Sequence, residues 1–434
     1  MNRQEAEDYI YASYMKAEPY LSYDSPDREK RHPGYSEEVI KSLYRGTVSV
    51  AVTGSKGKGS AAYILSSILS LYGKTGLMTG PHIESFNERF MAGGECISDD
   101  EFSDIVSLVR PLFDRISCDH TKGQFISPIG IETAVAEIFF SRHHTEFDIY
   151  EHGKGVRYDD VSNIPALYGL INTVFLEHKR ELGSTLKEIA SDKAGIIRSG
   201  MKGIYCGLQT DEVRELMLRR AAEEGVPMKL FGRDFDVSDV RFLDEGMCCT
   251  VSTSGRRYEN LSFSMLGTAQ CRNLALALQA AEDIIGDRFL ENEEEMRRFR
   301  DILKGLEWFG RLSLLSRDPF ILVDCCINRA SAAGAMEVMR ELGIDQADVI
   351  LAIPDDKDYP GVAEVVSQSG YDIILSEVKN PHYRFSGRQQ GELESAGIHC
   401  RYNKDLAEII KQADHPTVIL GTAAMLPEIK GARL

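Results

Sequence analysis

The chain has 434 residues, more than a single hydrophobic core usually supports, so two or more domains are expected. Its 43 % apolar and 27 % charged residues are typical of a globular protein, and no uncharged apolar run reaches the roughly 18 residues that a membrane helix needs. A net charge of −17 argues against a nucleic-acid partner, because binding to a phosphate backbone needs clustered lysine and arginine.

The first residues are acidic and lack the apolar segment of a secretion signal. The nine cysteines include no CxxC pair, and the adjacent pairs Cys248-Cys249 and Cys325-Cys326 are interpreted as small buried residues on strands. Structural disulfides are rare in the cytosol, so this cysteine usage favours a cytoplasmic protein.

Residues 1–46 are predicted to form helix, loop and helix, and a β-branched apolar run over 48–53 then predicts a buried strand. A loop rich in glycine, serine and lysine follows, and residues 61–69 have helical character. Strand, glycine-rich loop and helix form the context of a phosphate-binding loop, because glycines let several N–H groups face one anion near a helix N-terminus. The residues predicted to cradle nucleotide phosphates are Gly54, Ser55, Gly57, Lys58, Gly59 and Ser60.

This loop departs from the pattern G-x-x-x-x-G-K-[ST], because Gly59 follows the lysine and the hydroxyl comes one residue late, at Ser60. Glycine, lysine and serine are also ordinary turn residues, which is the alternative interpretation. The position between strand and helix favours phosphate binding, with Lys58 reaching the outer phosphates.

Two further strands are predicted to bring polar side chains to the same rim. Residues 76–79 predict a short strand followed by an irregular loop over 80–90, and helices are predicted from residue 99 and over 131–140. Residues 147–150 predict a strand that ends at Glu151, and an apolar strand over 169–176 ends at His178. Ligands bind beyond the carboxyl ends of the strands in a doubly wound parallel sheet, so the phosphate loop, Glu151 and His178 are expected to converge.

A capping box at Thr185–Glu188 begins a helix that carries Lys193. Residues 201–265 predict short strands and a helix, and an alanine-rich helix follows over 267–281. Strands over 320–324, 348–352, 372–375 and 417–420 then alternate with helices. We therefore predict an α/β protein with a P-loop parallel-sheet ATPase domain over residues 1–305 and a smaller Rossmann-like α/β domain over residues 306–434.

Each polar residue of the predicted rim has a second interpretation. Glu151 can hold Mg²⁺ together with phosphate oxygens, or it can face solvent at the end of its strand. His178 can be a metal ligand or an ordinary histidine, and Mn²⁺ is the alternative cation because imidazole is an unusual partner for Mg²⁺. Lys193, taken alone, is typical of a solvated lysine on a helix face.

Segments along nearly the whole chain resemble the folylpolyglutamate synthase/dihydrofolate synthase family of the Mur ligase superfamily. The similarity includes the phosphate loop at 53–60, Thr79-Gly80-Pro81-His82, the segments 86–90, 97–102 and 151–159, and Leu176-Glu177-His178. It continues through 182–186, 189–197, Gly310-Arg311, Asp324, 356–358 and 421–422, and the segment Lys193-Ala194-Gly195-Ile196 is especially specific.

The resemblance implies an ATP-dependent amide ligase. ATP would phosphorylate a small-molecule carboxylate, and an amino acid, with glutamate preferred, would attack the acyl phosphate to give an amide, ADP and phosphate. A nucleic-acid or membrane partner is not expected, and the chain is expected to be a monomer or a small homo-oligomer.

The resemblance also implies roles for individual residues. The catalytic residues would be Lys58, Glu151, His178, Lys193 and Arg311. The ligands of Mg²⁺, or of Mn²⁺, would be Ser60, Glu151 and His178. Lys193 would be carbamoylated, and the nucleotide contacts outside the phosphate loop would be Asn273, Arg311 and Asp324.

Several departures fall on the substrate side and at the domain interface. Gly80 stands where the family usually has a serine metal ligand, and Ala269 and Ile327 stand where histidines are expected. The family segment E-V-G-L-G-G-R-L-D-A-T-N here carries bulkier or charged residues, namely Lys154, Val156 and Tyr158. These changes favour a paralogue that acts on a different acid or amine over a housekeeping folate enzyme. Within the ligase interpretation, glutamate addition to a folate-like or another carboxylated substrate is preferred. One alternative is a nucleotide-binding homologue with altered or lost turnover that acts on a non-folate substrate or serves as a partner subunit. The other is a kinase that stops at the phosphorylated product.

Overall fold

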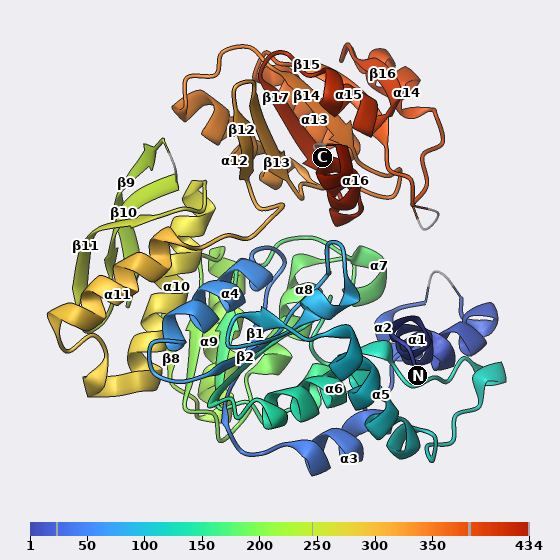
Figure 1. Cartoon of the computed structure of the whole chain (residues 1–434), viewed down its shortest axis with the longest axis vertical. Coiled ribbons are helices and arrows are strands. Elements are labelled where there is room, and N and C mark those ends of the chain that lie inside the picture. The colour runs from blue at the N-terminus through green and yellow to red at the C-terminus, as the bar shows by residue number, and fades with distance from the viewer. Residues whose placement is uncertain (23–24, 245, 381–382, 433–434) are drawn as a thin grey trace. The chain divides into compact units, whose positions relative to one another are not determined.

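The chain folds into two compact units. The computed structural model describes residues 1–22, 25–244, 246–380 and 383–432 (Figure 1). The first unit consists of residues 1–238, 251–258 and 272–302, and the second of residues 239–250, 259–271 and 303–434.

An eight-stranded sheet forms the centre of the first unit, in the order β4-β3-β2-β5-β1-β6-β7-β8. The strands are β1 (Val48–Thr53), β2 (Thr75–Met78), β3 (Phe90–Ala92), β4 (Glu95–Cys96), β5 (Phe147–Glu151), β6 (Tyr168–Ile171), β7 (Gly203–Cys206) and β8 (Met228–Leu230). β3 and β4 join antiparallel at one edge, whereas the other neighbours pair in parallel. The two antiparallel strands are too short to leave a periodic pattern, and they are absent from the prediction.

The α-helices that precede the second large sheet along the chain include those whose apolar faces pack on this first one. They are α1 (Arg3–Ala17), α2 (Asp27–Lys30), α3 (Gly34–Leu43), α4 (Lys58–Leu69), α5 (Asp99–Phe113), α6 (Pro128–Arg142), α7 (Lys179–Leu182), α8 (Leu186–Lys193), α9 (Asp211–Glu224), α10 (Thr268–Ile285) and α11 (Glu293–Lys304).

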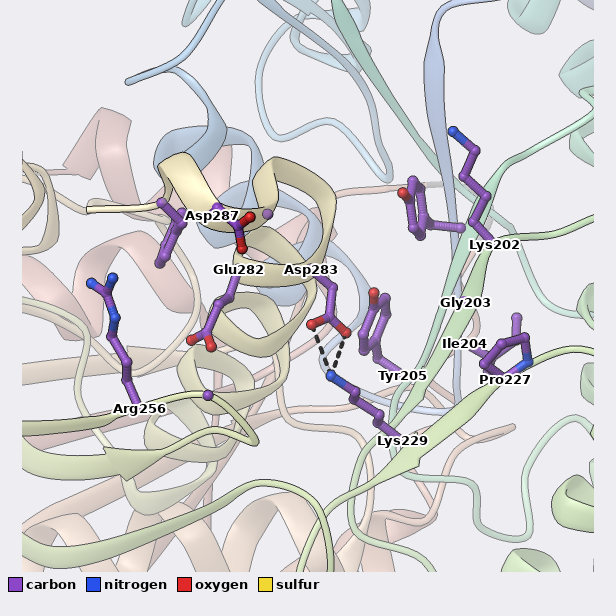
Figure 2. A pocket seen from close by; sticks show the side chains of 14 residues that line it. Lys202, Gly203, Ile204, Tyr205, Pro227, Lys229, Arg256, Glu282, Asp283 and Asp287 are labelled. Atoms are coloured by element: carbon purple, nitrogen blue, oxygen red, sulfur yellow. Dashed lines mark hydrogen bonds and ion pairs between the residues drawn. The ribbon is translucent and has the colours of Figure 1, made fainter. Parts of the chain in front are cut away.

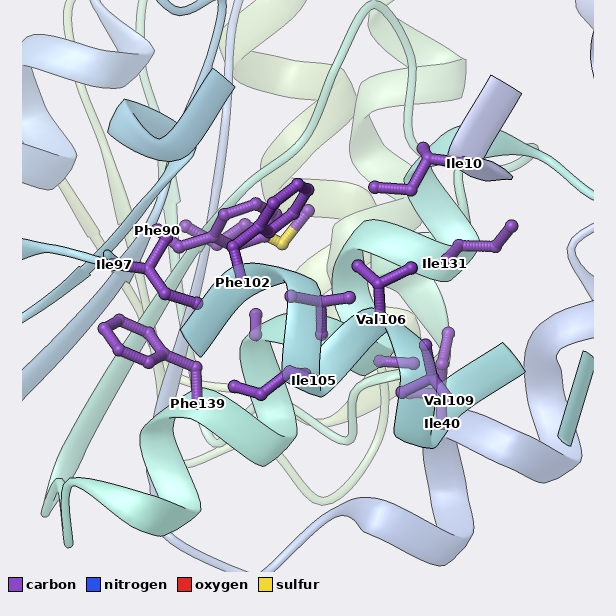
Figure 3. Close-up of a cluster of buried hydrophobic side chains, with 14 of the residues drawn as sticks. Ile10, Ile40, Phe90, Ile97, Phe102, Ile105, Val106, Val109, Ile131 and Phe139 are labelled. Carbon is purple, nitrogen blue, oxygen red and sulfur yellow. The ribbon is translucent and has the colours of Figure 1, made fainter. Parts of the chain in front are cut away.

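The larger apolar cluster joins α1, α3, α5 and α6 to β3 (Figure 3). In α5 the buried residues Phe102, Ile105, Val106 and Val109 recur at helical spacing, so one face of the helix is apolar. Full burial of each such side chain contributes about 1.5–3 kcal/mol. A second cluster joins α8 and α9 to β6 and β7. Because helices cover the parallel strands, β1 is a nearly continuous apolar run, as the sequence predicts.

The structure corrects the predicted strand that leads to His178. β6 ends at Ile171, and His178 follows only after a loop. The residues after β6 bond to the phosphate loop instead of a neighbouring strand: Ser55 N donates to the Thr173 carbonyl at 2.9 Å, and Phe175 N donates to Ser55 Oγ at 3.1 Å. The apolar run is therefore longer than the strand because its second half supports the phosphate loop.

A small three-stranded sheet, in the order β11-β10-β9, lies in the stretch that alternates between the units. Its strands are β9 (Asp236–Leu243), β10 (Gly246–Ser252) and β11 (Arg257–Phe263). Cys248 and Cys249 are buried in β10, which confirms their interpretation.

The second unit contains a six-stranded sheet in the order β12-β13-β17-β14-β15-β16. β12 (Ser313–Arg317) pairs antiparallel with β13 (Phe320–Asp324), and β14 (Asp348–Ala352), β15 (Asp372–Glu377), β16 (Arg401–Asp405) and β17 (Thr417–Gly421) continue in parallel. The helices are α12 (Arg329–Glu341), α13 (Tyr359–Gln368), α14 (Gln389–Ser395), α15 (Leu406–Gln412) and α16 (Leu426–Ala432). The predicted fold class is confirmed.

The adjacent cysteines of the second unit differ from their prediction. Cys326 is buried, but Cys325 is only half-buried, and both follow the last residue of β13. The strand ends at Asp324, so the two cysteines belong to the loop after it.

Candidate active site

The loop between β1 and α4 has the backbone that a phosphate cradle needs. Gly57 caps α4 with φ +82°, and Gly54 has φ +142°, which are conformations that residues with a side chain rarely adopt. A Cβ atom on Gly57 would lie 2.6 Å from Asn172 Nδ2, and one on Gly54 would lie 2.8 Å from Asn172 Cβ. α4 begins at Lys58, earlier than the predicted helix, so the N–H groups of Lys58, Gly59 and Ser60 form its first turn. This end of α4 can therefore bind an anion.

Two asparagines fix the other side of the loop. Asn172, directly after β6, donates from Nδ2 to Asn273 Oδ1 at 2.7 Å, and Asn273 comes from α10. A Cβ atom on Gly57 would lie 3.0 Å from Asn273 Oδ1, so the predicted nucleotide residue Asn273 lies beside the phosphate loop. Asn172 is absent from the predicted site, because nothing in its local sequence indicates this contact.

Glu151, the last residue of β5, lies against the start of α4. Its Oε2 accepts a hydrogen bond from Thr79 Oγ1 at 2.5 Å and one from the Gly80 backbone N–H at 3.2 Å. A Cβ atom on Gly59 would lie 3.1 Å from the same oxygen. The carboxylate therefore sits next to the phosphate loop, as predicted, and Thr79 is a partner that the sequence did not indicate.

The oxygens beside the loop fit a magnesium ion. Among the residues that the structure describes, the buried Ser60 hydroxyl has no hydrogen-bond partner. A hydroxyl and a carboxylate are the hard oxygen ligands that Mg²⁺ takes together with phosphate oxygens. No group of three or more His, Cys, Asp or Glu side chains within the described ranges could hold a metal ion, so a cation here would depend on the nucleotide for further ligands.

Lys193, the last residue of α8, is buried at the centre of the site, which corrects its interpretation as a solvated lysine. Its ammonium donates to the carbonyls of Gly54 and Lys154, each at 2.9 Å, and pairs with Glu177 Oε1 at 3.0 Å. It therefore joins the phosphate loop, the loop after β5 and the loop after β6. Burial, followed by the nearby charge of Lys58, lowers the pKa of Lys193 to about 8.

His178 begins α7 with φ +43°, a strained backbone for a residue other than glycine. Its Nε2 lies 3.8 Å from Glu177 Oε2, and its Nδ1 lies 4.0 Å from Glu181 Oε2. Burial is the main cause that lowers the pKa of His178 to about 4, so its imidazole is neutral at pH 7, as a metal ligand requires. Glu177 connects His178 to Lys193 and is a second residue that the predicted site omits.

A cavity of about 610 Å³ lies in the first unit next to these residues. Tyr14 and Phe125 meet edge to face in its wall, with ring centroids 5.3 Å apart. Arg89 pairs with Glu132 at 2.8 Å, and Lys154 pairs with Glu181 at 2.9 Å. The cavity thus combines aromatic rings with charged groups of both signs.

A second cavity, of about 510 Å³, lies away from the phosphate loop (Figure 2). It contains Tyr168 and Gly203, the first residues of β6 and β7, so it is at the opposite ends of the strands. Figure 2 shows Lys229 pointing at the Asp283 carboxylate, with distances of 2.7 and 2.8 Å to its two oxygens. Because it lies at the ends of the strands opposite the phosphate loop, this cavity is not part of the candidate site.

Arg311 and Asp324 lie near each other in the second unit. Asp324, at the end of β13, accepts a hydrogen bond on Oδ1 from the backbone N–H of Leu312 at 3.1 Å. Arg311 lines a cavity of about 820 Å³ with Trp308 and Phe309. The remaining predicted site residues, from Gly54 to Asn273, all belong to the first unit.

Comparison with known proteins places this geometry in context. No family model matches the chain. It is 27 % identical over 393 residues to the folylpolyglutamate synthase of Lacticaseibacillus casei, covering 88 % of this chain and 89 % of the relative. It is 29 % identical over 351 residues to the dihydrofolate synthase/folylpolyglutamate synthase of Bacillus subtilis, covering 80 % of this chain and 79 % of the relative.

Solved structures agree with these relatives. A folylpolyglutamate synthase in complex with AMPPCP and folate matches with a TM-score of 0.79 and 25 % identity over 100 % of this chain and 99 % of the other. In sequence and in fold, the chain is similar to proteins named folylpolyglutamate synthase and dihydrofolate synthase. The fold of the Mycobacterium tuberculosis folylpolyglutamate synthase matches with a TM-score of 0.84 and 21 % identity, over 97 % of this chain and 98 % of the other.

The homology confirms the predicted resemblance to the folylpolyglutamate synthases, and it does not favour the alternative of a homologue with lost turnover. Of the helices in the described ranges, none combines the length and the hydropathy that crossing a bilayer requires.

Proposed function

We propose that this chain is an ATP-dependent ligase that activates a carboxylate as an acyl phosphate and joins it to an amino acid, with glutamate as the amine and a folate-like acid as the preferred substrate. One observation carries the proposal: the phosphate loop, Glu151 and the Lys193–Glu177–His178 group gather at the carboxyl ends of β1, β5 and β6. The relatives named above are folylpolyglutamate and dihydrofolate synthases.

The first step is a phosphoryl transfer. The loop amides and Lys58 hold the phosphates, while a carboxylate oxygen of the acid attacks the γ-phosphorus and ADP leaves. Ser60, Glu151 and His178 would hold Mg²⁺, or Mn²⁺, which neutralises charge on the phosphoryl oxygens when bound. Phosphorylation is needed because a free carboxylate is a poor electrophile.

The second step forms the amide. The amino group attacks the acyl carbon and loses a proton, and phosphate leaves. A buried site protects the acyl phosphate from water, so the protein contributes mainly positioning and charge neutralisation.

The cavity beside Lys154 is the proposed site of the acid. Its aromatic wall at Tyr14 and Phe125 suits a planar ring system, and its cations suit a carboxylate. Lys154 connects the cavity to the phosphate loop. Its side chain lines the cavity, and its carbonyl accepts a hydrogen bond from the Lys193 ammonium, which also donates to the Gly54 carbonyl of the loop.

Lys193 has a further proposed role. A lysine with a pKa of about 8 is partly a neutral amine near pH 7.5, and only the neutral amine reacts with CO₂ to form a carbamate. Carbamoylation would turn the buried cation into an anion that supports the metal.

The second unit completes the proposed enzyme. Residues 1–305 would act as the ATP-binding domain and residues 306–434 as the C-terminal ligase domain, with Arg311 reaching the phosphates and Asp324 the ribose. The enzyme would act in the cytoplasm as a monomer or small homo-oligomer, without a nucleic-acid or membrane partner.

The test is ADP release measured with ATP, Mg²⁺, glutamate and either 7,8-dihydropteroate or tetrahydrofolate. We expect turnover that needs both the acid and the amine. Lys58→Ala should abolish it without unfolding the chain, and the exposed Lys187→Ala on α8 is the matched control. Nucleotide binding without turnover, or a phosphorylated product made without amine, would refute the ligase.

A further inference from the structure

Lys154 lies where the phosphate loop and the acid cavity meet. Its carbonyl accepts a hydrogen bond from Lys193 Nζ at 2.9 Å, and the same ammonium donates to the Gly54 carbonyl of the phosphate loop at 2.9 Å. The Lys154 side chain lines the cavity that contains Tyr14 and Phe125. One residue thus contacts both halves of the proposed reaction site.

The backbone around Lys154 is held in place. The Gly153 N–H donates to Asp159 Oδ2 at 3.0 Å, and the Val156 N–H donates to Asp192 Oδ1 at 2.6 Å. Asp159 and Asp192 are buried. The backbone that carries Lys154 is therefore fixed, so its side chain leaves the loop from a defined position.

The carboxylate that pairs with the Lys154 ammonium also lies near a second cation. This partner, Glu181, lies 2.9 Å from the ammonium, but it also lies 4.0 Å from Arg180 Nη2 and 4.0 Å from His178 Nδ1. One carboxylate thus lies beside an ammonium and a guanidinium, while the imidazole next to it is neutral at pH 7. Elsewhere in the cavity Arg89 has a carboxylate of its own. The Lys154 side chain is 43 % exposed, so an anion in the cavity can reach it.

We propose that Lys154 binds the carboxylate of the acid substrate and positions it for phosphorylation. This inference rests on the proposed ligase function. The substrate carboxylate displaces Glu181 as the counter-ion, and its aromatic part lies toward Tyr14 and Phe125. The family pattern has leucine at this position, so the charged contact is a property of this chain.

The first test replaces the ammonium. Lys154→Leu should raise the KM for the acid by about tenfold or more, the effect of losing one charge-assisted hydrogen bond. The KM for ATP should stay within about twofold, because the Lys154 carbonyl that binds Lys193 is retained. Lys154→Arg keeps the positive charge and should recover most of the affinity for the acid.

The second test removes the competing counter-ion. If Lys154 binds the substrate, Glu181→Gln should lower the KM for the acid, whereas Lys154→Leu raises it. If the pair only stabilises the fold, both variants should lower the unfolding temperature and leave the KM for the acid unchanged. Opposite changes in KM therefore support the inference, and equal or absent changes overturn it.

The probes are 7,8-dihydropteroate and tetrahydrofolate, tested with the full chain, and Lys187→Ala is again the control. Wild-type protein without acid-dependent turnover would refute the proposed ligase itself. Active wild-type protein whose Lys154→Leu variant keeps its KM for the acid would refute only the role of Lys154. Thermal unfolding of each variant separates loss of binding from loss of structure.

Discussion

Glu137 on α6 is a buried acid outside the candidate site, and it makes the first unit sensitive to pH. Tyr150 donates a hydrogen bond to its carboxylate. Burial is the main cause that raises the pKa of Glu137 from 4.5 to about 7, and the hydrogen bond opposes it only in part. Between these two values the folded chain binds more protons than the unfolded chain, so this contribution to stability is lost as the pH rises.

The corresponding prediction is that Glu137→Gln removes this pH dependence. The amide of the variant would still accept the hydrogen bond from Tyr150 but cannot ionise. Between pH 4.5 and pH 8 the free energy of unfolding of the variant should therefore rise relative to that of the wild type by up to about 3 kcal/mol. Urea unfolding followed by circular dichroism measures the difference, with the exposed Glu215→Gln as control. A constant difference between wild type and variant across this range would contradict the assignment.

Gly80 offers a test of the metal site. A Cβ atom there would meet no atom closer than Arg89 Nη1 at 3.8 Å, and the Gly80 N–H already bonds to Glu151. Gly80→Ser should therefore fold and add a hydroxyl near the proposed magnesium ligands.

We expect Gly80→Ser to lower the Mg²⁺ concentration that gives half-maximal ADP release several-fold, since a hard oxygen ligand is added. Gly34→Ser, at an exposed position that is also open, is the control. A variant with unchanged magnesium dependence would show that the family's serine position has no part in this site.

At the scale of elements, the turn from β1 into α4 depends on one glycine conformation. Gly57→Ala would force a Cβ atom into a positive φ and place it 2.6 Å from Asn172 Nδ2. We expect a loss of about 1–2 kcal/mol of stability from the strained backbone and at least a tenfold rise in the Kd for ATP.

Gly94→Ala separates strain from loss of binding. Gly94 has a similar φ of +86°, but nothing lies within 4 Å of its added Cβ atom. This variant should lose comparable stability and keep its affinity for ATP in a titration with a fluorescent analogue. Equal affinity in the two variants would remove Gly57 from the nucleotide site.

Local sequence was sufficient for some elements and not for others. The capping box at Thr185 and Glu188 was predicted correctly, since such a motif depends on neighbouring residues. The length of β6 was predicted incorrectly, because the residues after Ile171 form hydrogen bonds to a loop more than a hundred positions earlier in the chain. Helix periodicity could not reveal that Lys193 is buried, since its acceptors Gly54, Lys154 and Glu177 come from three other segments.

At the scale of the whole molecule, the sequence predicts the fold class and the convergence of Glu151 with the phosphate loop, because parallel strands place their carboxyl ends at one edge. Thr79, Asn172 and Glu177 were missed. Each acts through a side-chain contact to a distant segment, so no spacing in the sequence marks it.

Nucleotide binding should stabilise the whole chain. A ligand at a hundred times its Kd adds about 2.7 kcal/mol to the free energy of unfolding if it binds only the folded state. We therefore expect ATP with Mg²⁺ to raise the unfolding temperature of the wild type, and EDTA to reduce that rise. Differential scanning calorimetry of Lys58→Ala provides the comparison, and an undiminished rise in that variant would contradict the phosphate-loop assignment.

The buried ammonium of Lys193 has a consequence for how the two substrates influence each other. The Lys193 nitrogen donates both to the phosphate loop and to the segment that carries Lys154, so a shift in either segment can be transmitted to the other. Occupancy by nucleotide should then change the affinity for the acid, and the acid must change the affinity for nucleotide by the same factor. Removing the Lys193 ammonium should weaken this coupling between the ATP site and the acid site.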